Sequence, residues 1–207
     1  MGTAFSIAFI ITTIILCFIL AVLRNTHSKK RKAFVTQFLD EEHMANSSRK
    51  KDIDPSLLYE PDESLLAFVG ENDPHGVLKT SKKQMIYFSE PMTNLDIKRR
   101  FGASQVERVA QFEENYAAYL KAFVVWGQAL HSENNLEEAI VVIMHSISLG
   151  AEIRIAYKLA ADIFVANNDM DGLDELLSYA ESNYFKDEVV RNHIINYISQ
   201  ARGDFDE

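Results

Sequence analysis

Six histidines and one cysteine are the side chains of this chain whose types most often support metal binding or nucleophilic catalysis. They are His27, His43, His75, His131, His145, His193 and Cys17. A zinc site needs ligands at short spacing on one face, as in H-E-x-x-H, and no such pair occurs. A single thiol excludes an internal disulfide and a cysteine-based zinc site. We therefore expect neither a metal centre nor a cofactor.

Motifs for nucleotide binding and for serine nucleophiles are also missing from the sequence. It contains no G-x-x-x-x-G-K-[ST] and no G-x-G-x-x-G, and no serine lies in a G-x-S-x-G setting. We interpret the adjacent acids Glu41-Glu42 and Glu137-Glu138 as solvated faces. The sequence predicts a protein that is not an enzyme.

The distribution of charge limits the class of partner. The net charge is −9, and residues 121–207 carry six Lys or Arg against 15 Asp or Glu. The first 120 residues hold 15 of each sign. Because nucleic-acid binding depends on neutralising phosphate, we expect no nucleic-acid partner. The acidic C-terminal half suits a basic partner, or simply solubility.

An apolar run near the N-terminus must position everything that follows. After residues 1–3, residues 4–23 form a run of 20 residues without a charge or a proline. A helix of this length is about 30 Å long, which matches the hydrocarbon core of a bilayer. A cleaved signal peptide would have a basic stretch before the run and small residues at its end, and neither is present. The sequence predicts a single transmembrane helix over 4–23.

A basic juxtamembrane segment, residues 24–32, sets the predicted topology. It carries Arg24, Lys29, Lys30, Arg31 and Lys32, whereas no Lys or Arg precedes the span. The positive-inside rule then places the N-terminus outside and the C-terminal domain in the cytoplasm. These cations can also contact anionic lipid headgroups of the bilayer. The alternative is that they only set topology, and the two roles are compatible.

Residues 33–92 are predicted to form a proline-containing linker. All four prolines lie here, namely Pro55, Pro61, Pro74 and Pro91. Because proline breaks helices, we expect no long regular element in this range. Apolar clusters at 57–59, 65–69 and 85–88 interrupt it. Our hypothesis is that these clusters dock in extended form on the helical domain; alternatively, they are motifs for other partners.

Residues 93–203 are predicted to form an all-α domain, followed by an acidic tail at 204–207. Ser104 and Glu107 have capping-box spacing, and a stripe of apolar residues follows them on a long helix that ends near Ser132. Periodicity predicts further helices over 136–149, 155–166, 173–182 and 189–201.

Two helix pairs in this domain align at an offset of 34 residues. The aligned positions are Gly127 with Ala161, Leu130 with Phe164, Asn134 with Asn168, Ala139 with Leu173, Ile143 with Leu177, and Ser146 with Ala180. Two helices in 34 residues are typical of tetratricopeptide repeats. Residues 126–130 (WGQAL) and 136–140 (LEEAI) resemble that family's first and second helices. Over about 120–187 the chain is similar to a short, membrane-anchored member of the tetratricopeptide-repeat superfamily.

The resemblance implies a fold and a binding face. The fold is all-α: an N-terminal transmembrane helix and a short TPR-like α-hairpin repeat domain with flanking capping helices. Small residues at Gly127, Ala139 and Ser146 are expected because paired helices approach closely there. Leu173 replaces the usual alanine and no proline ends either unit, so related helical-hairpin families are an alternative. The first helices of the units would line a concave partner-binding face with Lys121, Val124, Gln128, His131, Lys158, Asp162 and Val165; the alternative is an ordinary solvated surface.

These observations favour a membrane-anchored adaptor that binds a basic or helical protein partner on the cytoplasmic side. Two alternatives stay open: an obligate subunit of a membrane complex, and an anchored receptor for basic amphipathic segments. Capture of a basic segment should weaken sharply with salt, whereas an obligate subunit should be poorly soluble alone. With only two repeats, self-association through an end face is a further alternative.

Overall fold

The computed structural model describes residue 24 and residues 29–49, 51–67, 69, 73, 75–89 and 91–203. The predicted span over 4–23, the N-terminus at 1–3 and the tail at 204–207 lie outside the described residues. Within the described ranges, no helix combines the length and the apolar character needed to cross a bilayer.

The described part of the chain is all-α, and its only β feature is a single bridge between Leu58 and Ile86. It divides into two compact units. The first unit combines the residues up to Lys51 with Thr93–Gln105, and the second combines Asp52–Met92 with the chain from Val106 onwards. The predicted boundary between the linker and the helical domain lay at residue 93. In the structure, most of the predicted linker, residues 52–92, belongs to the same unit as the helices from Val106 onwards.

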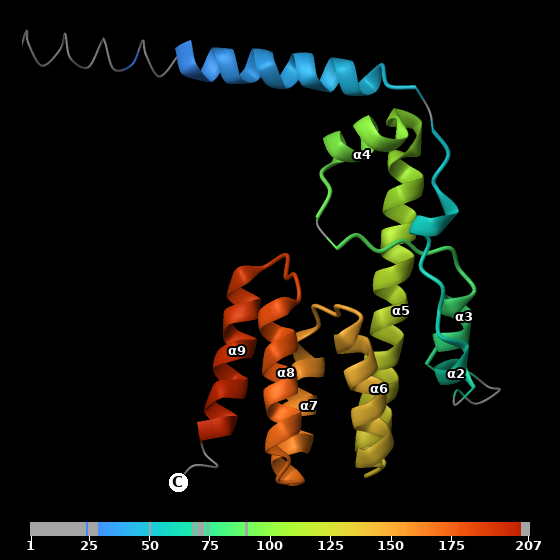
Figure 1. Cartoon of the computed structure of the whole chain (residues 1–207), viewed down its shortest axis with the longest axis vertical. Coiled ribbons are helices and arrows are strands. Elements are labelled where there is room, and N and C mark those ends of the chain that lie inside the picture. Colours follow the sequence, from blue (N-terminus) through green and yellow to red (C-terminus); the bar gives the residue numbers. More distant parts are fainter. Residues whose placement is uncertain are drawn as a thin grey trace, which may run out of the picture. The chain divides into compact units, whose positions relative to one another are not determined.

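The first unit contains a helix over 29–46, drawn in blue in Figure 1. The expectation of no long regular element within 33–92 is wrong here, because residues 33–46 contain neither proline nor glycine and the first proline is Pro55. The C-terminal end of this helix pairs with α4 (Asn94–Phe101) through the Glu42–Lys98 and Glu41–Arg99 ion pairs.

The start of the long helix α5 also differs from expectation. Ser104 lies inside a short 3₁₀ helix, η2 (Ala103–Gln105), and α5 begins at Val106. A capping box does occur, but at the start of α4. The Thr93 hydroxyl accepts the Asp96 backbone N–H at 3.2 Å, and the Asp96 carboxylate accepts the Thr93 N–H at 3.0 Å.

The second unit contains the helices predicted from periodicity. They are α5 (Val106–Ser132), α6 (Leu136–Ser148), α7 (Arg154–Ala166), α8 (Met170–Ser182) and α9 (Glu188–Gly203). Figure 1 shows α6 beside α5, and α7, α8 and α9 beside one another. Each predicted helix is confirmed to within about three residues at its ends, the scatter expected for such boundaries.

The turns of the two hairpins have the same geometry at the same offset. Asn134 and Asn168 both adopt left-handed backbone angles, with φ of 61° and 55°. The residue after each asparagine donates its backbone N–H to a carbonyl of the preceding helix. Asn135 donates to Leu130 and Asp169 donates to Phe164, each over 2.9 Å. Its side chain also caps the second helix of each hairpin. The 34-residue offset seen in the sequence is therefore also a repeat of backbone conformation.

Close helix approach explains the small residues of the hairpins. A Cβ atom at Gly127 would lie 2.4 Å from Ile143 Cγ1, which confirms that α5 and α6 leave no room there. Ser146 is buried and donates its hydroxyl to the Leu120 carbonyl at 3.1 Å. In the second hairpin, a Cβ at Gly172 would lie 2.4 Å from the Phe164 ring.

The segment over 52–92 packs along α5. Besides η1 (Pro55–Leu57) it forms two short helices, α2 (Glu63–Leu66) and α3 (Val77–Ser81). The Tyr59 ring lies 5.0 Å from Tyr116, and Ile86 donates its N–H to the Phe112 carbonyl at 3.3 Å. These are contacts that the docking hypothesis expects for the clusters at 57–59 and 85–88.

Candidate functional site

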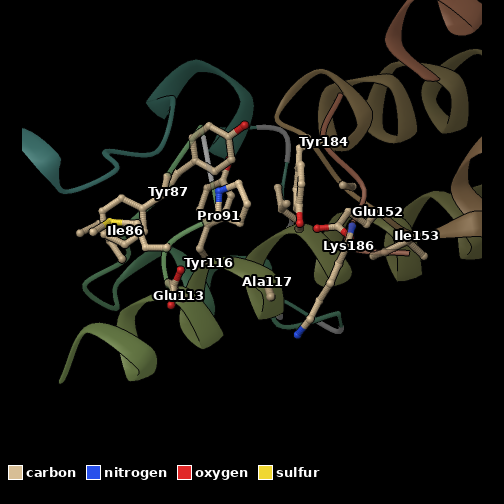
Figure 2. Close-up of a pocket in the computed structure, with 15 residues that line it drawn as sticks. Ile86, Tyr87, Pro91, Glu113, Tyr116, Ala117, Glu152, Ile153, Tyr184 and Lys186 are labelled. Carbon is tan, nitrogen blue, oxygen red and sulfur yellow. The ribbon is translucent and has the colours of Figure 1, made fainter. Parts of the chain in front are cut away.

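A cavity of about 440 Å³ lies where the 86–92 segment, α5 and two interhelical loops meet. Figure 2 shows Tyr87 and Pro91 on one side and Tyr184, Glu152 and Lys186 on the other, with α5 along the floor. We call it the tyrosine groove. Its lining residues are Ile86, Tyr87, Phe88, Pro91, Met92, Glu113, Tyr116, Ala117, Leu120, Gly150, Ala151, Glu152, Ile153, Tyr184 and Lys186.

The first wall is held by an aromatic contact and a glycine. Tyr116, on α5, donates its hydroxyl to the Leu149 carbonyl at 2.7 Å, and its ring lies 5.2 Å from that of Tyr87. Gly150 has a φ of +87°, and a Cβ there would lie 3.4 Å from the Tyr87 hydroxyl oxygen. Gly150 therefore both ends the α6 region and leaves room for Tyr87.

The opposite wall follows α8 and is held by polar contacts. Asn183 donates its amide to the Ile147 carbonyl at 2.8 Å and to the Tyr157 hydroxyl at 3.1 Å. Lys186 donates its backbone N–H to the Glu152 carboxylate at 2.6 Å. Burial raises the pKa of Tyr157 to about 12, so its hydroxyl stays protonated at neutral pH. These contacts fix the loop between α8 and α9, which places Tyr184 in the lining of the groove.

The groove offers aromatic faces and two carboxylates, Glu113 and Glu152. Tyr87 and Tyr184 are each 46% exposed, although both are large aromatic residues. Burial raises the pKa of Glu113, and the nearby Lys186 ammonium opposes this shift. Glu152 accepts the Lys186 backbone N–H and keeps its negative charge, so both lining carboxylates would attract a bound cation. The chemistry of the lining is that of a binding site for an apolar or basic side chain.

The predicted concave face is distributed over several environments. Val124 is 2% exposed and belongs to the apolar core, so it does not lie on a surface that a partner could contact. Lys121 lines a separate cavity of about 330 Å³ between α3 and α5. Gln128 and His131 are half-buried, and Val165 is exposed.

The remaining two predicted face residues contact α9. The Lys158 ammonium lies 4.5 Å from the centre of the Tyr197 ring, and the Tyr197 hydroxyl donates to Asp162. The structure thus brings Lys158 and Asp162 together on one α9 side chain. Both act in holding α7 against α9, a role that sequence reasoning did not identify.

The histidines and the basic segment can also be placed. Among the described residues, no group of three His, Cys, Asp or Glu side chains could hold a metal ion. His145 is half-buried, its ring lies 5.0 Å from that of Phe123, and burial lowers its pKa. The predicted membrane-surface residues Arg24, Lys29, Lys30, Arg31 and Lys32 are all exposed.

Sequence reasoning missed the tyrosine groove, although part of its signal was present. The cluster at 85–88 stood out as unusually aromatic for a linker, and Pro91 follows it closely. Tyr184 lies far away in sequence between two helices, in a stretch without a motif. Only the docking of 52–92 on α5 brings the two tyrosines to one cavity.

Comparison with protein families, curated proteins and solved structures finds no match for this chain.

Proposed function

We propose that this protein is a membrane-anchored adaptor whose TPR-like domain binds a segment of a partner protein in the tyrosine groove. The observation that carries the proposal is the pair of half-exposed rings, Tyr87 and Tyr184, on opposite sides of a mostly apolar cavity. Exposed aromatic side chains beside a well-formed pocket are typical of interaction hot spots.

The charges favour a basic residue in the bound segment. Glu113 lies in the groove as a carboxylate whose pKa burial has raised, so a cation placed beside it replaces lost solvation. A Lys or Arg side chain can also stack on the tyrosine rings. The acidic balance of residues 121–207 acts in the same direction at longer range.

The test is site-specific photo-crosslinking in cells with the full chain. A photoreactive residue at Tyr184 should capture one reproducible protein, whereas the same residue at the exposed Val141 on α6 should not. Equal capture at both positions, or none at Tyr184, would contradict a groove-bound partner. Constant stoichiometric recovery from membranes would instead favour an obligate subunit.

The captured protein then allows a binding assay with the purified full chain. Tyr184→Ala should weaken its affinity by about tenfold or more, as for other aromatic hot spots. Glu113→Gln should remove any increase in affinity as the pH rises through the pKa of Glu113. If Glu113→Gln leaves the pH and salt dependence of binding unchanged, the partner is not held by a basic residue at this carboxylate.

A further inference from the structure

The N-terminal half of the helix over 29–46 carries an apolar surface that no other described residue covers. Residues 29–40 are all exposed. Phe34 is 70% exposed, Leu39 58% and Phe38 50%. Three large apolar side chains at such exposure, within two turns of one helix, are typical of a surface that binds another protein or a membrane.

These side chains form one face. Phe34 and Phe38 are one turn apart, as are Val35 and Leu39, so together they span about 140° of the helix circumference. The more polar Thr36 and Asp40 fall on the other side. Ala45 falls on the same side as the two phenylalanines and is 1% exposed, so this face is covered towards the C-terminal end of the helix, where Glu41 and Glu42 pair with α4.

The charges beside this face indicate which molecule binds it. Lys29, Lys30, Arg31 and Lys32 are consecutive, exposed and adjacent to Phe34. A helix with cations at one end and phenylalanines along one face is suited to the interface of an anionic bilayer. A parallel second copy would instead bring two such cationic clusters together.

The acidic residues of the helix fit the same arrangement. Glu41 and Glu42, which anionic headgroups would repel, are paired with Arg99 and Lys98 of α4. The charge that faces outward from the apolar half is therefore mainly positive. Residues 24–28 can reach at most about 18 Å, so an anchor over 4–23 would keep this helix beside the bilayer.

We propose that residues 29–40 form an interfacial helix, with Phe34, Val35, Phe38 and Leu39 inserted among the headgroups of an anionic leaflet. This deepens the proposed function, on whose anchor it rests, by adding a second membrane contact. The contact with the membrane ends where Glu41 and Glu42 bind α4. The first unit, which contains α4, is therefore held at the membrane surface.

The test uses the full chain reconstituted in vesicles, with Cys17→Ser as the background. Nitroxide labels are placed at Phe38→Cys and, as the matched control on the opposite face, at Thr36→Cys. Electron paramagnetic resonance then compares collisions with oxygen, which concentrates in lipid, and with a water-soluble nickel complex. In vesicles containing phosphatidylserine, the label at position 38 should collide several-fold more with oxygen relative to nickel than the label at position 36.

Other outcomes overturn the proposal. Strong nickel collisions at position 38 would show a water-exposed face, and low collisions with both reagents would show a cover of protein, such as a second copy. Replacing Lys29, Lys30, Arg31 and Lys32 with Gln should reduce the ratio of oxygen to nickel collisions at position 38. An unchanged ratio would contradict the proposed attraction of these cations to anionic headgroups.

The anchor is assayed separately in the same vesicles by extraction at alkaline pH. A chain that is extracted lacks the span, which would contradict the proposed anchor whatever the label at position 38 reports. A chain that resists extraction while position 38 stays in water retains the anchor and refutes the interfacial helix.

Discussion

At the scale of single residues, packing in this domain depends on where side chains are missing. Gly127 is helical, so its role is not a special backbone angle but the absence of a Cβ atom against Ile143. The polar counterpart is His145, which is packed among apolar groups. Its Nε2 atom is buried and has no hydrogen-bond partner among the described residues. Each of these features leads to a measurable effect.

Gly127→Ala should lower the free energy of unfolding by about 1–3 kcal/mol, because Ile143 must leave its rotamer or the helices must separate. Equilibrium denaturation by urea measures the change. Gly203→Ala is the matched control, since a Cβ there meets no atom within 4 Å, and it should change stability by less than about 0.5 kcal/mol. Equal effects at both positions would show that helix propensity, and not the contact, decides the result.

His145→Phe should flatten the dependence of stability on pH. Burial lowers the pKa of His145 below its ordinary value of 6.5, with the Asp62 charge opposing the shift. The unfolded state therefore binds the proton more readily, and stability is lost as the pH falls from 6.5 towards the folded pKa. Comparing urea denaturation of wild type and variant at pH 7.5 and 5.5 isolates this histidine from the others. A parallel loss in both proteins would exclude His145 as the cause.

At the scale of elements, the hairpins depend on one asparagine in each turn. Asn134 and Asn168 adopt positive φ angles, which asparagine tolerates better than most residues with a side chain. The neighbouring Asn167 has φ of −90° and needs no such tolerance. The same chemistry thus occurs at equivalent places in both hairpins.

Asn134→Ala and Asn168→Ala should each destabilise the domain by about 1 kcal/mol, because alanine is strained in the left-handed region. Asn134→Gly and Asn168→Gly should be close to neutral. Thermal unfolding followed by circular dichroism measures both pairs, with Asn167→Ala as the control that should cost less. A glycine variant as unstable as the alanine variant would place the asparagine's contribution in its side-chain contacts.

At the scale of the whole molecule, the segment over 52–92 belongs to the repeat domain. It supplies the buried Val77, Met85 and Ile86, and it also provides one wall of the tyrosine groove. A partner that binds the groove therefore contacts this segment and the repeat helices together. Ligand binding and docking of the segment are expected to stabilise each other.

Hydrogen–deuterium exchange of the full chain should show slow exchange at Tyr59 and Ile86, whose N–H groups bond to Met85 and Phe112 carbonyls. Peptides that cover the exposed helical residues 29–40 report, in the same sample, the exchange rate of backbone N–H groups that no other described segment covers. Exchange at Tyr59 and Ile86 as fast as in unstructured peptides would show that the segment does not stay docked. The groove would then lack its first wall, and the proposed binding mode would fail.

Local patterns predicted the helices well, and long-range contacts account for what they missed. The five repeat-domain helices follow from apolar periodicity, and the 34-residue offset extends to α9, which starts 34 residues after α7. The helix over 29–46 was not predicted, because the range 33–92 was read as irregular from its prolines, all of which lie beyond residue 54. The roles of Lys158 and Asp162 depend on Tyr197, a partner that sequence spacing alone does not indicate.

The contact between Phe164 and Gly172 bears on how the two hairpins arose and whether they could be exchanged. At the equivalent positions the first hairpin has Leu130 and Glu138, so a larger residue on one helix accompanies a smaller one on the other. If the hairpins descend from one duplicated ancestor, these substitutions have made the copies non-interchangeable. A chimera that joins α7 to α6 would set a phenylalanine against a glutamate where the parent has no side chain. The second hairpin, α7 with α8, has to be inherited, or engineered, as a whole.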